Sequence, residues 1–315
     1  MEIDSVLPEK PEFEFLRKRD FRIRTMKMAG VLSQGICFPL SLLPEGEYNV
    51  GDDVTSVLGV AKYDEYQDEA NKEQKKHSAF RRFLFRHRAT RPIAKLLFMG
   101  AEKKKDDFPD FVSKTDETRI QNLTYLLEDK KTKWVGREKI DGSSGTFFLR
   151  KTKNPIPFLP ARYEFGVCSR NRRILKDDGS AFWQVAKRYD LKNVLREMIA
   201  GQDWVCIQGE VIGPKIQGNK YHVSEPDLYC FNLIYPGRKV SCYSAEDAVG
   251  VHGLKWAPRV VEDYVLPDTV GEVIDFATGE SALYPTIREG VVFRNYQTGQ
   301  SFKAVSNEFL LKHKL

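Results

Sequence analysis

The chain has 315 residues, of which 41% are hydrophobic and 30% charged, enough to bury one large domain or two smaller ones. No apolar run reaches the length of a membrane span, and the start MEIDSVLPEKPEFEF has neither the basic beginning nor the apolar middle of a signal peptide, so we expect no membrane partner. Five scattered cysteines, never in C-x-x-C spacing, argue against a disulfide framework and a zinc site, and favour the cytoplasm or another reducing compartment.

Short strands are predicted within residues 21–44, where Phe21, Ile23 and Thr25 fall at alternate positions. A polar stretch follows, with a short helix expected after Asp53. This part of the chain therefore predicts a small β-rich segment.

A basic segment comes next and accounts for more than the whole net charge of +6. Between Lys72 and Lys105 there are twelve Lys and Arg residues and two acidic ones, a local excess of ten, with phenylalanines interleaved among the arginines. Such a segment suits a polyanion such as nucleic acid, although a helix with buried phenylalanines and solvated arginines gives the same pattern.

Strands dominate the sequence from Trp134 onward. They are predicted over KWVGREKI, GTFFLRK, WVCIQGEVIG, LYCFNLIY, EGVVFRN and SFKAV. One helix, DGSAFWQVAKRYDLKNVLREMIAG, is expected among them and should end at the glycine stop Gly201. Many strands with few helices between them predict an α+β fold of largely antiparallel sheets.

The segment EKIDGSSG places a lysine and an aspartate in K-x-D-G spacing. If Lys139 ends a strand, Lys139 and Asp141 project to the same side, because residues two apart in a strand share a face. Asp141 and Gly142 then predict a tight turn, with 146–149 as the returning strand. On its own the pattern also fits a surface hairpin in which both charges face water.

Further charged or aromatic residues follow at strand ends in a fixed order: Arg170 in CSRN, Glu210 in QGEV, Phe231 beside Asn232, Glu289 in EGVV and Lys303 in FKAV. The ordered set K-x-D-G, S-R, G-E, F-N, E-G-V-V and F-K resembles the covalent nucleotidyltransferases, the superfamily of ATP-dependent ligases and capping enzymes.

The segments KMAGVLSQG, VGDDVTSVLGVAKY and FVSKTDETRIQN further resemble ATP-dependent RNA ligases whose OB module is N-terminal. The resemblance implies that 1–60 is a partial OB-like segment and that 61–315 is an α+β nucleotidyltransferase domain. Twelve residues follow Lys303, so we expect no C-terminal OB domain. Alternatives are a DNA ligase, a GTP-dependent capping-type enzyme, or an inactive relative that only binds nucleic acid.

This resemblance implies that the amine of Lys139 attacks the α-phosphorus of ATP to form lysyl-AMP. A free lysine, with a pKa of about 10.4, is almost entirely protonated at neutral pH. Asp141, Glu210 and Glu289 would hold Mg²⁺ or Mn²⁺ through oxygen ligands. The cation and Lys303 would offset the negative charge of Asp141 beside the amine, and Lys303 would bridge the α-phosphate oxygens.

The remaining site residues are implied with alternatives. Phe231 would stack on adenine or belong to the core, and Glu138 would contact adenine or ribose. Arg170 would contact ribose or an RNA 5′-phosphate. Lys114 and Arg119 would contact the β- and γ-phosphates or RNA, or form a salt bridge at a helix start.

Two positions depart from the patterns of some RNA ligases. Val305 stands where a second lysine of the last motif occurs, and Ser144 stands where asparagine is frequent. We expect a monomer that joins RNA with 5′-phosphate and 3′-hydroxyl ends, in nicked duplex.

Overall fold

The computed structural model describes residues 1–314 except 2, 4, 29, 64–107, 153–160 and 241. The basic segment Lys72–Lys105 lies outside the described residues, so its predicted contact with nucleic acid stays a prediction. The chain forms two compact units, one from Met1–Glu73 with Asn307–Leu315 and the other from Gln74–Ser306. None of the helices in the described ranges is long and apolar enough to cross a membrane.

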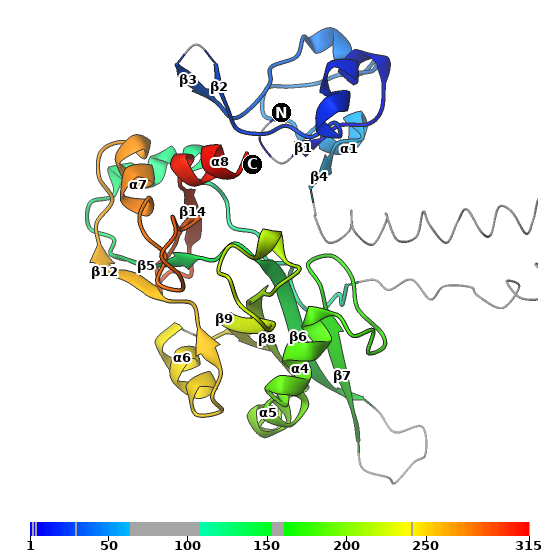
Figure 1. The fold of residues 1–315 in the computed structure, drawn as a ribbon, viewed down its shortest axis with the longest axis vertical. Helices are drawn as coiled ribbons and strands as arrows, with labels where there is room; N and C mark the ends of the chain where they lie inside the picture. The colour runs from blue at the N-terminus through cyan, green and yellow to red at the C-terminus, as the bar shows by residue number, and fades with distance from the viewer. Residues whose placement is uncertain are drawn as a thin grey trace, which may run out of the picture. The chain divides into compact units, whose positions relative to one another are not determined.

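The first unit is a small β module with short helical turns (Figure 1). Two antiparallel pairs join β1 (Ser5–Val6) to β4 (Ala61–Lys62) and β2 (Met26–Met28) to β3 (Val31–Ser33). The helical segments are η1 (Pro11–Arg19), η2 (Leu40–Leu42), α1 (Thr55–Leu58) and α8 (Asn307–His313). The short helix expected after Asp53 is α1, whose first N–H donates to Asp53 Oδ1 at 2.9 Å.

The strands predicted in residues 21–44 are confirmed only as β2 and β3. Phe21 and Ile23 are buried, as their alternation required, but they pack on Leu7, Phe13 and Leu16 rather than in a ladder. Phe21 has φ 57°, a left-handed backbone that no strand contains. Alternation of apolar residues thus marked burial here and not a strand.

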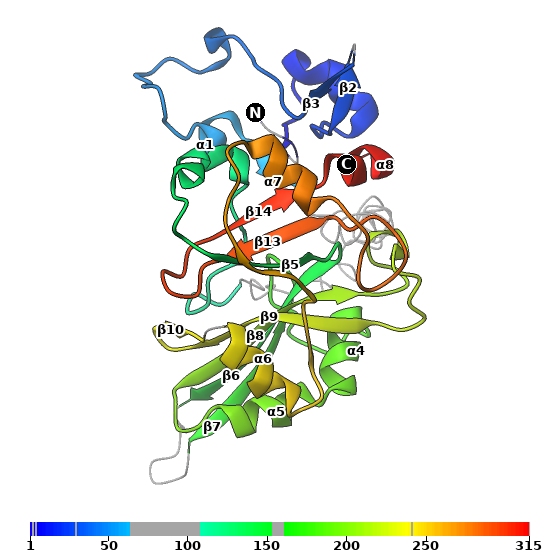
Figure 2. The same cartoon turned by 90° about the vertical axis from the view of Figure 1, so that its left-hand side faces the viewer.

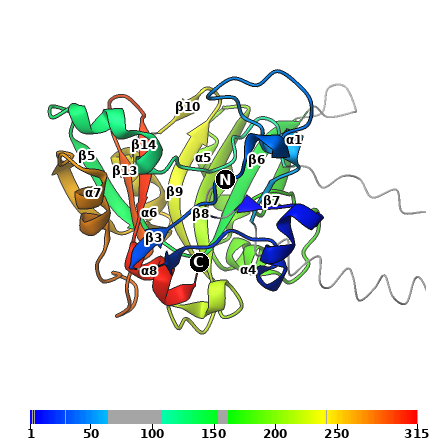
Figure 3. The same cartoon turned by 90° about the horizontal axis from the view of Figure 1, so that it is seen from above.

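The second unit contains two sheets, which Figure 3 shows side by side. The larger has the order β10-β9-β8-β6-β7, with β11 beside β9, and the smaller has the order β12-β5-β13-β14. The larger sheet comprises β6 (Ser143–Thr152), β7 (Arg162–Cys168), β8 (Trp204–Ile212), β9 (Asp227–Tyr235), β10 (Arg238–Lys239) and β11 (Lys255–Trp256). The smaller comprises β5 (Trp134–Lys139), β12 (Arg259–Tyr264), β13 (Gly290–Arg294) and β14 (Ser301–Val305). Only the β11–β9 pair among them is parallel, so the predicted α+β fold of largely antiparallel sheets is confirmed.

Helices flank both sheets (Figure 2). α4 (Ala181–Arg188) and α5 (Leu191–Met198) contact the larger sheet at β6, β7 and β8, α6 (Cys242–Gly250) contacts β9 and β11, and α7 (Val270–Ala277) contacts β13 and β14. The described part of the unit also contains the 3-10 turns η3 (Ile120–Asn122), η4 (Thr124–Glu128) and η5 (Gln217–Asn219). The helix predicted before Gly201 is two helices, because Asp190 between them has φ 46°.

The two faces of the smaller sheet differ in character. Trp134, Phe293 and Phe302 lie on one face and are fully buried beside α7, with the two phenylalanine rings stacked 5.0 Å apart. The strand register places Lys139, Arg137, Arg294 and Lys303 on the opposite face. One face therefore forms the core, and the other carries the charges from which the site is built.

Candidate active site

The K-x-D-G segment connects the two sheets. Lys139 is the last residue of β5, which pairs with β12 and β13, whereas β6 begins at Ser143 and pairs with β7 and β8. The returning strand of a hairpin would have paired with β5, so the predicted hairpin turn is wrong. Gly142 lies where the chain crosses: a Cβ there would be 2.5 Å from the Val211 carbonyl oxygen and 2.9 Å from Glu210 Cγ. Only glycine permits this approach between β6 and β8.

Lys139 is paired with a carboxylate 150 residues further along the chain. Gly290 is opposite Lys139 in the ladder, and this brings the preceding residue, Glu289, to the end of β5. Lys139 Nζ lies 2.5 Å from Glu289 Oε1, with a quarter of the lysine side chain exposed. The other oxygen, Glu289 Oε2, is buried and has no hydrogen-bond partner within the described part of the chain.

Asp141 is held by a loop that the sequence reasoning did not select. Its carboxylate forms an ion pair with Lys220, and its N–H donates to Tyr221 Oη at 2.8 Å. The loop contains left-handed residues, among them Asn219 with φ 50°. The Gly-Asn dipeptide in IQGNKY is a turn signal that pointed to this loop, directly downstream of the G-E motif.

Three carboxylates and one amine share a single electrostatic environment. Burial raises the pKa of Glu210 to about 8; Lys139 opposes this rise, and Glu289 and Asp141 add to it. Burial likewise raises the pKa of Glu289, against the effect of Lys139. Burial alone would lower the pKa of Lys139, but Glu289, Glu210 and Asp141 outweigh it, so that pKa is raised. The resting amine is therefore protonated.

The other motif lysine, Lys303, lies in the centre of β14. Its N–H donates to the Thr118 carbonyl at 2.9 Å, and its Nζ lies 3.2 Å from Asp116 Oδ1. Arg170 Nη2 is 3.9 Å from the same Asp116 oxygen. Lys303 also acts on Glu289, whose pKa it lowers. The structure thus brings Lys139, Glu289 and Lys303 into one site.

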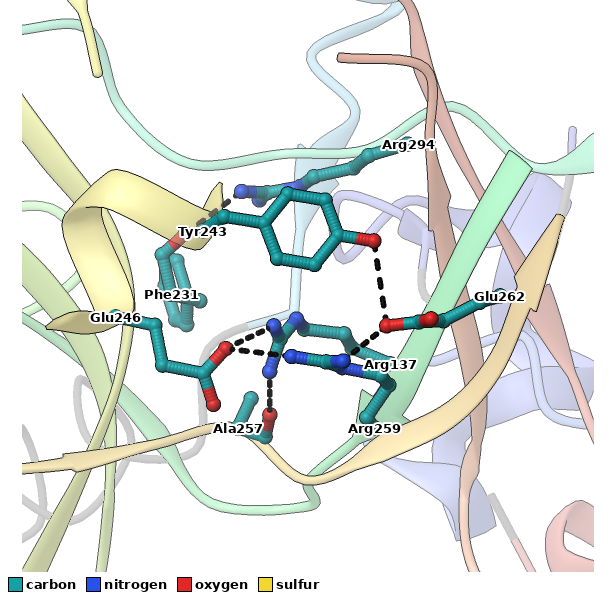
Figure 4. Close-up of polar contacts among 8 residues, drawn as sticks. All are labelled: Arg137, Phe231, Tyr243, Glu246, Ala257, Arg259, Glu262 and Arg294. Carbon is teal, nitrogen blue, oxygen red and sulfur yellow. Dashed lines mark hydrogen bonds and ion pairs between the residues drawn. The ribbon is translucent and has the colours of Figure 1, made fainter. Parts of the chain in front are cut away.

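Phe231 is partly buried in β9 and contacts the apolar cluster that contains Ile140 and Tyr221. Arg294 Nη1 donates to the Phe231 carbonyl at 2.6 Å (Figure 4). It also donates to Asn232 Oδ1 at 2.7 Å. These bonds fix the strand that presents the ring. The ring combines a fixed backbone with partial exposure, which is what a stacking platform requires.

An ion cluster lies between β5, β12 and α6 (Figure 4). Arg137 is buried, donates to the Ala257 carbonyl at 2.7 Å and pairs with Glu246. Arg259 Nη2 lies 3.1 Å from Glu246 and shares this carboxylate with Arg137. Because Arg137 is two residues before Lys139, the cluster fixes the strand that ends in the lysine.

The remaining predicted site residues, Glu138, Lys114 and Arg119, each lie in a different environment. Glu138 lies on the core face of β5, where its two oxygens accept from Ser281 Oγ at 2.5 Å and from the Ala282 N–H at 2.8 Å. Lys114 is exposed, with Asn171 Oδ1 3.4 Å from its Nζ. The backbone of Arg119 forms an isolated parallel β-bridge with that of Lys303, so Arg119 lies beside β14.

The structure also locates Ser144 and Val305, the two positions that depart from the patterns of some RNA ligases. Ser144 Oγ lies 2.7 Å from Thr115 Oγ1, within β6 opposite Glu210. Val305 is buried at the end of β14. Because residues two apart in a strand share a face, Val305 lies on the same face as Lys303 and not on the face of the apolar core.

No group of three or more His, Cys, Asp or Glu side chains in the described ranges is arranged to hold a metal ion. Asp141, Glu210 and Glu289 influence one another electrostatically, but lysine ammonium groups pair with two of them. In this arrangement the positive charge of the site comes from lysines.

Comparison with known proteins places this geometry in context. A family model described as RNA ligase matches residues 132–305, and a model of an OB-fold domain matches residues 1–40. No curated protein sequence matches the chain.

Solved structures of an RNA ligase from Naegleria gruberi are similar over 100% of this chain. A mutant of that enzyme with ATP and Mn is 27% identical over 85% of its own chain, with a TM-score of 0.74. The enzyme with pyrophosphate is 28% identical over 86%, with a TM-score of 0.73. Another mutant, with AMP and Mn, is 27% identical over 86%, with a TM-score of 0.72.

Proposed function

Because the chain belongs to the RNA ligase family, we propose that Lys139 is its nucleophile and takes AMP from ATP. The observation that carries this proposal is the position of Lys139 Nζ at the junction of two sheets, 2.5 Å from Glu289 and in the field of Asp141 and Glu210. The nucleotide is proposed to be ATP because the similar Naegleria gruberi enzyme is described with ATP and with AMP.

The first step forms a P–N bond between Lys139 Nζ and the α-phosphorus, and breaks the P–O bond to pyrophosphate. The amine must first lose a proton, since its pKa is raised in the resting site. Glu289 Oε1 already accepts a hydrogen bond from this amine, and burial raises the pKa of Glu289. Glu289 is therefore placed to take the proton.

The three carboxylates offer the oxygen donors that a divalent cation takes, although in the arrangement described above lysines pair with two of them. Glu289 Oε2 is a buried oxygen that lacks a partner in the described part of the chain, and Glu210 is a partly buried carboxylate whose pKa burial raises to about 8. Asp141, Glu210 and Glu289 would hold Mg²⁺ or Mn²⁺, which take oxygen ligands. Such an ion, when bound, would favour the free amine and neutralise phosphate charge.

The surrounding residues are proposed to bind the nucleotide. Lys303 lies where its ammonium reaches a phosphate, and Phe231 would stack on adenine. Glu138, Lys114 and Arg119 are proposed to support the ribose, the β- and γ-phosphates or the RNA, and Arg170 a ribose or a 5′-phosphate.

Two later steps complete the proposed reaction. AMP moves from Lys139 to the 5′-phosphate of RNA, and a 3′-hydroxyl then attacks that phosphorus and releases AMP. We propose nicked duplex RNA as substrate, a monomeric enzyme and a cytoplasmic or other reducing location.

The test is the intact mass of the protein after incubation with ATP and Mg²⁺ or Mn²⁺. The expected result is a single acid-labile addition of AMP that maps to Lys139, is absent with EDTA and is not matched by GTP. Lys139→Ala should abolish the addition. Lys133→Ala is the matched control, since Lys133 is an exposed lysine directly before the other end of the same strand and should leave the addition unchanged.

The proposal fails if Lys139→Ala still takes up AMP at the parental level. Parallel assays with nicked RNA and nicked DNA distinguish the RNA ligase from a DNA ligase. Joining of neither substrate, with normal AMP uptake, would restrict the proposal to the first step.

A further inference from the structure

Three lysines of the site are paired with acids. Lys139 pairs with Glu289 and Lys220 pairs with Asp141. Both of these acids belong to the motifs. The third pairing differs, because its acid, Asp116, comes from the segment Ser113–Arg119 that precedes them.

One oxygen of the Asp116 carboxylate, Oδ1, contacts two cationic side chains. This oxygen is 3.2 Å from Lys303 Nζ and 3.9 Å from Arg170 Nη2. Two cations that converge on one anionic oxygen have the arrangement by which proteins bind phosphate oxygens. The Asp116 side chain is 49% exposed, whereas Lys303 is 15% and Arg170 32% exposed. The two cationic side chains are thus more buried than the Asp116 carboxylate, which lies on the solvent side of the site.

We propose that the Asp116 carboxylate occupies a phosphate subsite between Lys303 and Arg170 in the substrate-free protein and is displaced by a substrate phosphate. The inference rests on the proposed function, since it requires a phosphate at Lys303. It adds to that function a residue that competes with substrate.

The segment 113–119 does not need Asp116 to stay in place. Gln208 Nε2 donates to the Ser113 carbonyl at 2.9 Å, Thr115 Oγ1 lies 2.7 Å from Ser144 Oγ, and the Thr118 carbonyl accepts from the Lys303 N–H.

Glu117, the neighbour of Asp116, adds a further anchor: its Oε1 is 3.1 Å from Arg294 Nη2 and its Oε2 accepts from Ser301 Oγ. The segment therefore has anchors on β6, β8, β13 and β14. Movement of the Asp116 side chain alone would release the subsite.

The contacts of Asp116 with Lys303 and Arg170 are also weak enough to be exchanged. Charge-assisted N–H···O bonds are about 2.7–2.9 Å long, and both Asp116 distances exceed this range. A half-exposed ion pair contributes little, so its loss costs little. A phosphate carries more negative charge and more acceptor oxygens than a carboxylate, so it should win the subsite when present.

The phosphate has two possible sources, a phosphate of ATP and the 5′-phosphate of RNA. Asp116→Asn removes the competing charge with almost no change of shape. We expect the dissociation constant or KM of whichever phosphate enters the subsite to fall about two- to fivefold, the range that loss of a partly exposed ion pair allows. The rate at saturation should be unchanged.

The experiment has two arms. The first measures the dissociation constant of ATP by calorimetry, and the second measures KM for a 5′-phosphorylated RNA end with enzyme that already carries AMP. Asp268→Asn is the matched control, because Asp268 forms an exposed ion pair with Lys130 and its loss changes net charge equally. Asp116→Ala serves as the second variant, with the melting temperature of each measured.

A lower constant in the first arm assigns the subsite to ATP, and in the second arm to the RNA end. Unchanged or weaker binding in both arms would overturn the inference, as would a fall in the saturated rate, which would make Asp116 a structural clamp. Failure of the proposed function would show instead as absence of lysyl-AMP in the parent, whatever the affinity for ATP.

Discussion

Substitution of Gly142 by alanine tests whether the crossing between the sheets fixes the site. The added Cβ would be 2.5 Å from the Val211 carbonyl oxygen, 2.9 Å from Glu210 Cγ and 3.1 Å from Ile212 Cγ2. The first distance is about 1 Å shorter than an ordinary contact of roughly 3.5 Å. Since a backbone oxygen cannot rotate away, β6 must separate from β8 by a comparable amount.

Two effects of known size follow from this displacement. Overpacking in a core costs about 1–3 kcal/mol, so we expect the free energy of unfolding to fall by about 2 kcal/mol. Glu210 lies at the point of overlap and Asp141 is the adjacent residue, so both carboxylates move relative to Lys139. A misplacement of about 1 Å can cost about 10²-fold in rate, and we expect lysyl-AMP formation to slow by that factor.

The assay combines denaturant unfolding with the single-turnover rate of AMP uptake. Gly271→Ala in α7 is the control, since its Cβ would meet only Thr269 Oγ1 at 3.9 Å and the change should be neutral or slightly stabilising. The reasoning is refuted if Gly142→Ala unfolds at the parental free energy and takes up AMP at the parental rate.

Two further predictions concern stability. Burial raises the pKa of Glu210 from its ordinary 4.5 to about 8, so the folded protein binds this proton more tightly than the unfolded chain and stability falls as pH rises between these values. In EDTA, Glu210→Gln should remove a loss of up to about 5 kcal/mol between pH 4.5 and 8.5; equal pH slopes for parent and variant would contradict this. Glu246→Gln should cost about 2 kcal/mol because it leaves the buried Arg137 without its carboxylate, whereas Arg259→Gln should cost under about 1 kcal/mol. Denaturant unfolding measures both changes in the free energy of unfolding. Equal losses in the two variants would contradict the larger contribution expected of the Arg137–Glu246 pair.

The positions of the charged motif residues in the strands were predictable from the sequence, because each lies at or in a strand that could be recognised by itself. Lys139 ends β5, Glu289 precedes β13 and Lys303 lies inside β14, as the segments KWVGREKI, EGVVFRN and SFKAV predict. Strand order was not predictable in this way. Two strands separated by a short turn signal normally pair with each other, and local sequence does not show that β5 and β6 enter different sheets.

Backbone breaks limited the prediction elsewhere. Asp190 divides a helix whose apolar periodicity is continuous, and Phe21 interrupts an alternation that looked like a strand. Both residues have positive φ without being glycine, so no residue type signalled the break. Lys220 and Asp116 were missed for a related reason: they lie in loops, where no period links a residue to the site.

Glu138 shows why nearness in sequence is a poor guide at this site. It precedes Lys139, yet alternation along β5 turns it to the core face, where Ser281 and Ala282 use both of its oxygens. A direct contact with adenine or ribose would have to use the remaining acceptor position of an oxygen that already accepts a hydrogen bond on the core face. Its physical role in the resting protein is to fix the loop at 281–283, and Leu283 of that loop contacts the same apolar cluster as Phe231. Any influence of Glu138 on the nucleotide is thus expected to pass through the loop, while the partner of Lys139 is supplied from β13, 150 residues away.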